Sequence, residues 1–270
     1  MQAMHGGKAK HDTIDAQKIA VLPRGGLLPQ AYVSPAARRA TRDLLRRRMH
    51  VMRKRAALLA PIHHTNRQYN LPELGKKIAD KANRDGGAER FPEPAVQQSI
   101  EVDLALIGHY DQRLRDMELA ILKAAKQHAT HTLYLLRTVP GIGEILSLVL
   151  RYDIHAIERF PRVQAFGSSC RLVKCAQESA GKRYGPSGAK MGNADLKGAF
   201  SEAAVRFLRA NPAGQQYLAR LEKKHGQGKA LPVLAHTLAR AVYDMLQRKT
   251  AFDLPTFLRG YGSEADEPDA

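Results

Sequence analysis

Two acidic residues near the start of the chain have a spacing that suits chemistry on phosphate groups. Asp12 and Asp15 stand three residues apart in the segment KAKHDTIDAQKIA. The pattern predicts a helix over residues 12–22, which would carry both carboxylates on one face. Carboxylate pairs hold Mg²⁺ in phosphoryl-transfer sites, usually with further acids from other elements. Taken alone, the pair is explained better by a helix cap at Asp12 and an acid in the first turn, so both interpretations stay open.

A second candidate for chemistry is the glycine-rich segment CAQESAGKRYGPSGAKMGN, residues 175–193. It lacks the GxxxxGK[ST] order of a P-loop. A basic loop that carries serines can still hold a phosphate, and Ser179 or Ser187 could attack one. Lys182, Arg183 and Lys190 are the candidate phosphate ligands. Residue types alone favour a flexible surface loop.

The segment TVPGIGEILSLVL, residues 138–150, predicts a tight turn between two helices. One helix would end at Arg137 and the next would begin near Glu144. Gly141 and Gly143 would let the backbone approach a ligand closely, and the first N–H groups of the second helix would point outward. This matches the turn of helix-hairpin-helix modules, which hold DNA phosphates without contacting bases. An ordinary turn explains the motif equally well, and the charge of the chain favours DNA.

The composition favours a polyanionic partner. The chain of 270 residues has 43 Lys and Arg against 26 Asp and Glu, a formal net charge of +17. No apolar run approaches the roughly 20 residues that would cross a membrane, and no signal peptide is visible. We expect a cytoplasmic, nucleoid-associated protein that binds nucleic acid and no membrane. Cys170 and Cys175 lack a nearby His pair for zinc, so we expect reduced thiols.

Two long heptad helices should position these segments. The first runs from Ala36 to Ala60, with a seam at Leu45, Met49, Met52, Ala56 and Leu59, and should end at Pro61. It carries nine Lys or Arg against one acid, and the predicted phosphate contacts are Arg46, Arg47, Arg48, Arg53 and Lys54.

A connector over residues 61–98 leads to the second helix, whose seam is Ile107, Tyr110, Leu114, Met117, Ile121 and Ala124. An antiparallel hairpin is the economical arrangement, although either helix could pair with another subunit.

The last block, from about His131 to Phe257, is also predicted to be helical. Asn193 should cap a helix that stops at Asn211-Pro212. Residues 229–246 form a core helix on which His236 and Arg240 share one face, either as a satisfied polar pair or facing a phosphate.

Four segments in order resemble one family: HGGKAKHDTIDAQKIA, LPQAYVSPAARRATRDLLRRRMHVMRKR, TVPGIGEILSLVLRYDIHAIERFPRVQAFGSSCRL and ESAGKRYGPSGAKMGNADLKGAFSEAA. They look like insertion-sequence transposases of the DEDD type, the IS-one-ten class that includes the pilin gene inverting recombinase. The resemblance implies a mainly α chain: residues 1–35 as the remnant of a RuvC-like, RNase H-fold domain, 36–130 as coiled-coil helices, 131–258 as the C-terminal transposase domain with its helix-hairpin-helix-like motif, and 259–270 as a disordered tail.

The resemblance also implies a chemistry, DNA strand cleavage and rejoining. Asp12 and Asp15 match the last pair of the family's acidic quartet, which binds Mg²⁺. Ser179 in ESAGK best matches the nucleophile that forms a covalent link to DNA, and Ser187 matches it less well. The implied partners are DNA, a structured bridge RNA and further copies of the chain, as a dimer or tetramer.

The family's first Asp and its Glu lie well upstream of the Asp-x-x-Asp pair, but only eleven residues precede Asp12. We therefore expect an N-terminally truncated copy with an incomplete metal site, which binds DNA without strand transfer. Whether this chain is itself an enzyme stays open. The alternatives are a non-catalytic helix-hairpin-helix DNA-binding protein and a structural coiled-coil protein.

Overall fold

The computed structural model describes residues 32–72, 76–126, 131–173, 175–179, 182–187 and 192–260, with isolated positions between 16 and 25. The chain divides into the units Met1–Ala36 and Ala37–Ala270, and almost all described elements lie in the second. The predicted metal pair Asp12 and Asp15, the predicted ligand Lys190 and most of the predicted tail lie outside the described residues.

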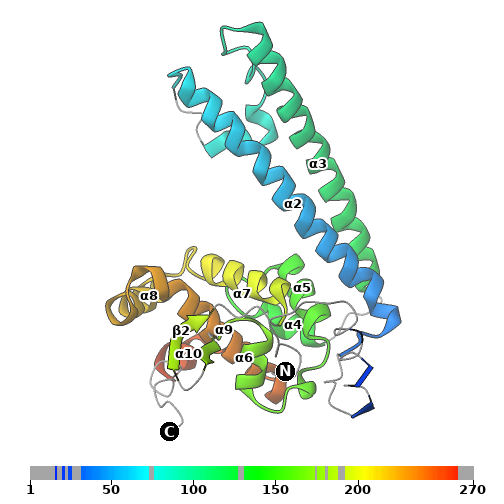
Figure 1. Ribbon diagram of the computed structural model, residues 1–270, viewed down its shortest axis with the longest axis vertical. Helices are drawn as coiled ribbons and strands as arrows, with labels where there is room; N and C mark the ends of the chain where they lie inside the picture. The colour runs from blue at the N-terminus through cyan, green and yellow to red at the C-terminus, as the bar shows by residue number, and fades with distance from the viewer. Residues whose placement is uncertain are drawn as a thin grey trace. The chain divides into compact units, whose positions relative to one another are not determined.

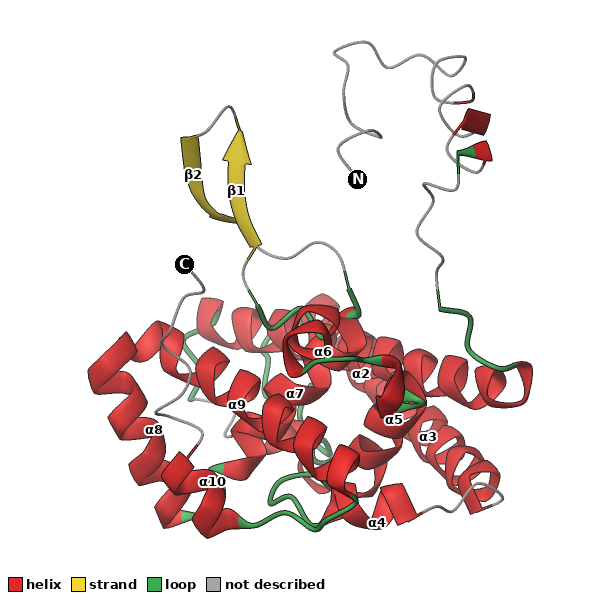
Figure 2. Ribbon diagram, turned by 90° about the horizontal axis from the view of Figure 1, so that it is seen from below, coloured by secondary structure: helices red, strands yellow, loops and turns green. Residues whose placement is uncertain are grey.

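The mainly α prediction is confirmed for the described residues (Figures 1 and 2). The helices are α2 (Ala36–Gln68), α3 (Pro94–Lys126), α4 (His131–Arg137), α5 (Glu144–Ile154), α6 (Val163–Ser169), α7 (Ala194–Phe207), α8 (Pro212–His225), α9 (Gln227–Arg248) and α10 (Leu254–Gly260). Short 3-10 helices cover Lys76–Ala79, Lys81–Asn83 and Ile157–Arg159. No described helix is long and apolar enough to cross a membrane.

Helices α2 and α3 form an antiparallel pair, which Figure 1 shows in blue and green. The ion pairs fix this direction, because Arg48 contacts Glu118 at 2.5 Å and Arg55, seven residues later, contacts Asp111, seven residues earlier, at 2.5 Å. Of the predicted α3 seam, Ile107, Leu114 and Ile121 are buried. The two helices therefore run in the antiparallel direction that the hairpin prediction requires, and the predicted coiled-coil packing stays a prediction.

The predicted seam of α2 is partly wrong. Met52 is 37% exposed and Ala56 is also exposed, whereas Arg48 and Arg55 keep only 16% of their side-chain surface. Arginine can occupy a helix–helix seam when a carboxylate on the partner helix takes its charge and its carbon stem packs against apolar neighbours. A pattern of apolar residues alone therefore selects the wrong positions.

The prediction that Pro61 ends the first helix is also wrong, since Pro61 lies inside α2. A proline within a helix loses one backbone hydrogen bond, here to the carbonyl of Ala57, and Ala57 is an exposed residue, so water can reach it. One residue later Ile62 is fully buried, and the side-chain amide of Asn66 donates to the carbonyls of Leu71 and Pro72. This packing offsets the cost of about 3 kcal/mol.

The connector between α2 and α3 folds onto the far end of the hairpin. A small core there contains Ile62, Ile78, Ala88, Phe91, Ile100 and Ile107. The connector also contributes Arg84, whose guanidinium lies 2.5 Å from Asp111. The connector is thus a packed cap on the hairpin and is shorter than the predicted 61–98.

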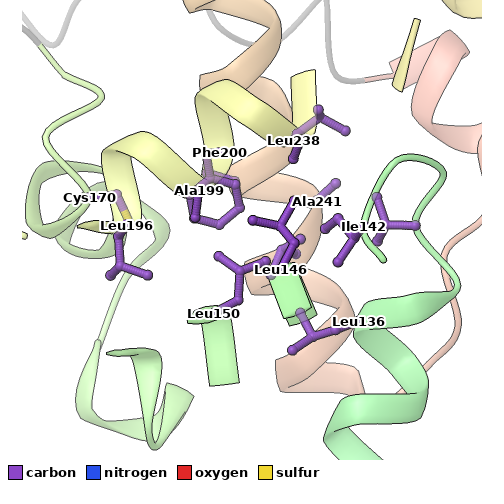
Figure 3. Close-up of a cluster of buried hydrophobic side chains, with 14 of the residues drawn as sticks. Leu136, Ile142, Leu146, Leu150, Cys170, Leu196, Ala199, Phe200, Leu238 and Ala241 are labelled. Carbon is purple, nitrogen blue, oxygen red and sulfur yellow. The ribbon is translucent and has the colours of Figure 1, made fainter. Parts of the chain in front are cut away.

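The main core surrounds α9, which contacts α4, α6, α7 and α8. Figure 3 shows its apolar side chains, with Leu238 and Ala241 of α9 close to Phe200 of α7 and Leu146 of α5. The predicted cap of α7 is confirmed, because the Asn193 side chain accepts from the N–H groups of Asp195 and Leu196 at 2.8 and 3.2 Å. The Asn211-Pro212 pair begins α8 instead of ending α7, which stops at Phe207.

The segment predicted as a glycine-rich loop contains the strands β1 (Cys175–Ser179) and β2 (Lys182–Ser187), the yellow arrows of Figure 2. They pair antiparallel, with Ser179 opposite Lys182 and Cys175 opposite Ser187. The register shifts between Ala176 and Glu178. The loop interpretation is wrong for residues 175–179 and 182–187, because they pair as two antiparallel strands.

Candidate nucleic-acid interface

The exposed face of α2 carries uncompensated positive charge. Arg47, His50 and Lys54 recur at spacings of three and four, so they lie along one face, and Arg53 lies beside them. All four are exposed. The one acid in α2, Asp43, lies 3.5 Å from Arg42. No salt bridge joins Arg47, Arg53 or Lys54 to a carboxylate among the described residues, so this face of α2 presents three positive charges.

The predicted phosphate contacts Arg46 and Arg48 are engaged within the chain. Arg46 donates to the Asp153 carboxylate at 2.7 Å, and its Nε lies 3.1 Å from Asp195. Arg48 donates to Glu118 at 2.7 Å. Burial acts to lower the pKa of Arg46, but Asp153 and Asp195 outweigh it and raise the pKa. The role of Arg46 and Arg48 as phosphate contacts stays a prediction. Their ion pairs within the chain already give both arginines a role in holding the helices together.

Asp153 of α5 connects α2 and α7, and it was not singled out from the sequence. Its side chain is 3% exposed and accepts hydrogen bonds from Arg46 of α2 and, at 3.1 Å, from Asn193, the cap of α7. A buried carboxylate is stable only when paired in this way. The signal was present, because Asp153 is the one acid in the buried stretch of α5. The network attaches α2 to the C-terminal helices.

The turn at residues 138–143 has the predicted helix ends, and its two glycines differ. Gly141 has φ +90°, and a Cβ there would lie 2.5 Å from the backbone nitrogen of Phe207. This glycine is required for packing against α7. Gly143 is exposed, and a Cβ there would meet nothing within 4 Å. Only Gly143 faces open space.

Gly143 is also the N-cap of α5. The first N–H of this helix with a helical partner is that of Ser147, which donates to the Gly143 carbonyl at 2.9 Å. The N–H groups before it have no helical acceptor, as at any helix start, and they suit an anion. A groove of ≈ 290 Å³ beside this end is lined by Arg48, Met49, Gly143, Glu144, Glu202 and Arg206, among others. The groove brings α2 and the glycine turn to one surface.

The structure describes the backbone of the predicted nucleophile but not its surroundings. Ser179 is the last residue of β1, opposite Lys182, and Arg183 lies opposite Glu178. The hairpin returns to α7 through Gly192, whose carbonyl accepts from Arg171 at 2.7 Å. Asp12, Asp15 and Lys190 lie outside the described residues, so their convergence with Ser179 stays a prediction.

No group of three or more His, Cys, Asp or Glu side chains that could hold a metal occurs among the described residues. The described residues therefore do not by themselves fit the Mg²⁺ ion that the sequence resemblance implies. Asp12 and Asp15 remain the candidate ligands.

The polar side chains of the C-terminal helices that the sequence singled out are partly or fully buried within the fold. His236 and Arg240 are half-buried on α9, and the His236 ring lies against Gly167 of α6. Burial, and then the charge of Arg240, lowers the pKa of His236. Cys170 is a fully buried free thiol, and burial raises its pKa to about 12. Cys170 is free, the side chain of Cys175 lies outside the description, and the reduced state of both thiols stays a prediction.

These features define a class: a basic, mainly helical protein with a cationic helix and an open glycine turn, as phosphate-binding proteins have. A family model described as "Transposase IS116/IS110/IS902 family" matches residues 133–219. The match runs from α4 through the glycine turn and the β-hairpin into α8, under half of the chain. It supports an insertion-sequence transposase. A comparison with curated proteins finds no match.

Proposed function

We propose that this chain is an insertion-sequence transposase that holds DNA between the exposed face of α2 and the glycine turn. The observation that carries the proposal is the groove beside the start of α5, where Arg48 and Met49 of α2 lie near Gly143. The turn at Gly143 lies within the residues that match transposases, and α2 lies before them. Arg47 and Lys54 are seven residues apart, about 10 Å along the helix. That span covers about three phosphates of one strand.

The proposed reaction is strand cleavage and rejoining. The Ser179 hydroxyl would attack a DNA phosphorus, forming an Oγ–P bond as the bond from phosphorus to the sugar oxygen breaks. The serine proton is lost, and the sugar oxygen leaves as a hydroxyl. Attack by a second DNA hydroxyl reverses these steps and rejoins the strands. Asp12 and Asp15 would hold Mg²⁺, which when bound neutralises phosphate charge.

Two further partners belong to the same proposal. A structured bridge RNA and additional copies of the chain follow from the resemblance of four segments to RNA-guided relatives. The charge of +17 supports a large nucleic-acid partner.

DNA binding is tested with the double variant R47Q/K54Q and fluorescence anisotropy on duplex DNA. Each lost phosphate contact should reduce the slope of log affinity against log salt by about 0.9. The double variant R209Q/K223Q removes the same charge from two exposed positions, one in the turn after α7 and one on α8, and is the matched control. Equal losses in both variants would refute the proposed interface.

Catalysis is tested on supercoiled plasmid with Mg²⁺. The incomplete metal site expected from the sequence predicts that the wild-type chain binds the plasmid without nicking it. Nicking with a covalent protein–DNA adduct on a denaturing gel would refute that expectation, and loss of the adduct in S179A would then support Ser179 as the nucleophile. S187A is the control and should keep the adduct. An adduct that persists in S179A would remove this serine from the proposal.

The second candidate is a non-catalytic helix-hairpin-helix DNA-binding protein, which the open turn at Gly143 supports equally. It predicts salt-sensitive DNA binding with no adduct under any metal condition.

A further inference from the structure

A cavity separate from the glycine turn lies where the start of α2, α4 and the ends of α5 and α9 meet. Its volume is ≈ 570 Å³, within the range of small-ligand sites. Its apolar lining is made of buried residues, namely Leu135, Leu136, Ile154, Ile157 and Leu246. Such a surface suits an uncharged ring or sugar face.

The polar lining of this cavity is predominantly cationic. Arg38, Arg151 and Lys249 contribute positive charge from α2, α5 and the end of α9, and His131 and His155 add two imidazoles. Among the described residues of the lining, Glu158 is the one acid. Three helices thus direct cations to a single space beside an apolar floor.

Part of this charge has a structural role. Arg151 donates to the carbonyl of His155 at 2.5 Å, at the end of α5, and Lys249 ends α9 with φ +56°. Cations at helix ends stabilise the terminal carbonyls. Arg38 stands near the start of α2 instead, where a helix end favours an acid, so the helix dipole does not explain it.

The lowered pKa of His155 indicates that positive charge predominates around this cavity. Burial lowers the pKa of His155, and Arg38, Arg151 and Arg159 lower it further, while Glu158 opposes them weakly. An anion in the cavity would relieve this repulsion.

We propose that the cavity binds one nucleotide unit, with its phosphate against Arg38 and Lys249 and its base or sugar on the apolar floor. Both halves of the chemistry are needed, because phosphate alone would leave the apolar floor in contact with water and a nucleoside alone would bring no negative charge to Arg38 and Lys249. The inference comes from the lining of the cavity and does not depend on the proposed transposase function. The nucleotide could be free or part of a single strand, and the two sources share this chemistry.

The test uses the full chain and adenosine monophosphate as probe, with titration calorimetry. The probe should bind at least about tenfold more tightly than adenosine or inorganic phosphate. Lys249→Gln and Arg38→Gln should each weaken binding by about tenfold. Lys223→Gln, an exposed position on α8, should leave it unchanged. Circular dichroism verifies that each variant is folded.

Competition by a 5′-phosphorylated trinucleotide separates the two sources. Displacement of the probe assigns the cavity to a strand, and failure to displace it assigns the cavity to free nucleotides. Binding of adenosine or phosphate as tightly as the nucleotide, or equal binding by all variants, would overturn the proposal. DNA affinity on duplex is measured in parallel, so loss of one activity does not count against the other.

Discussion

His236 shows how one buried side chain makes stability depend on pH. Its pKa is held below the ordinary value of 6.5, first by burial and then by Arg240. The unfolded chain then binds this proton more readily than the folded chain. His236 in its neutral form therefore makes its full contribution to the free energy of unfolding above pH 6.5. That contribution decreases as the pH falls below this value.

This predicts a loss of stability on acidification that H236Q reduces. Denaturation by urea at pH 7.5 and pH 5.5 should give a smaller difference for H236Q than for wild type. H50Q, on the exposed face of α2, is the control and should keep the wild-type difference. His155, whose pKa is shifted in the same direction, accounts for a remaining slope. An unchanged difference in H236Q would contradict the assignment.

Asp111 is a second residue whose contribution to stability depends on its surroundings. Its side chain is 17% exposed and contacts both Arg55 and Arg84. Burial acts to raise its pKa, but the hydrogen bonds and charges of the two arginines outweigh this and lower it. Removing the carboxylate leaves Arg84, 8% exposed, without its counter-charge.

We predict that D111N lowers the free energy of unfolding by about 3 kcal/mol. D116N is the matched control on the same helix, because its partner Arg113 is 55% exposed and such pairs contribute under about 1 kcal/mol. Urea denaturation measures both. Equal losses would mean that the Arg55–Asp111–Arg84 cluster contributes no more than a surface pair.

At the scale of elements, the glycine turn combines a packing glycine and an open one. G141A should lower the free energy of unfolding by more than about 2 kcal/mol, because its φ and the backbone of α7 exclude a Cβ. G143A should cost at most about 1 kcal/mol, since its φ of −82° suits any residue. Thermal melts measure both variants. Stability losses in the reverse order would refute the assignment of the two glycines.

The same pair tests the interface. If phosphates approach α5 at Gly143, G143A should weaken DNA binding while remaining folded. A folded G143A with wild-type affinity would place DNA elsewhere.

The sequence predicted correctly those features that are determined by residues close together in the chain. The cap at Asn193 and the helix ends around the turn at 138–143 depend on neighbouring residues, and both are confirmed. Pro61, the arginines of the α2 seam and Asp153 depend on partners far along the chain, which no local pattern contains. The chemistry assigned to Ser179, Asp12 and Asp15 came from resemblance to a family and stays a prediction.

At the scale of the molecule, one buried network connects α2 to the helices that match transposases. Asp153 binds both Arg46 and the cap of α7. We predict that D153N lowers the free energy of unfolding by about 2 kcal/mol, less than a fully enclosed pair because Arg46 is 39% exposed. Urea denaturation measures this, with D43N, whose side chain is 58% exposed, as control. A loss no larger than that of D43N would mean that the network does not stabilise the junction.

The seven-residue repeat of the ion pairs has one more consequence. If α2 shifted by seven residues along α3, Arg48 would come opposite Asp111 and could form an ion pair there. The charge of Arg48 therefore does not by itself distinguish the observed alignment from the shifted one. Arg55 would then face Leu104, and Glu118 would face Thr41. Arg84 of the connector donates to Asp111 of α3 and to the carbonyl of Ala79, and Arg55 of α2 donates to the same carbonyl. The connector therefore binds both helices and favours a single offset between them.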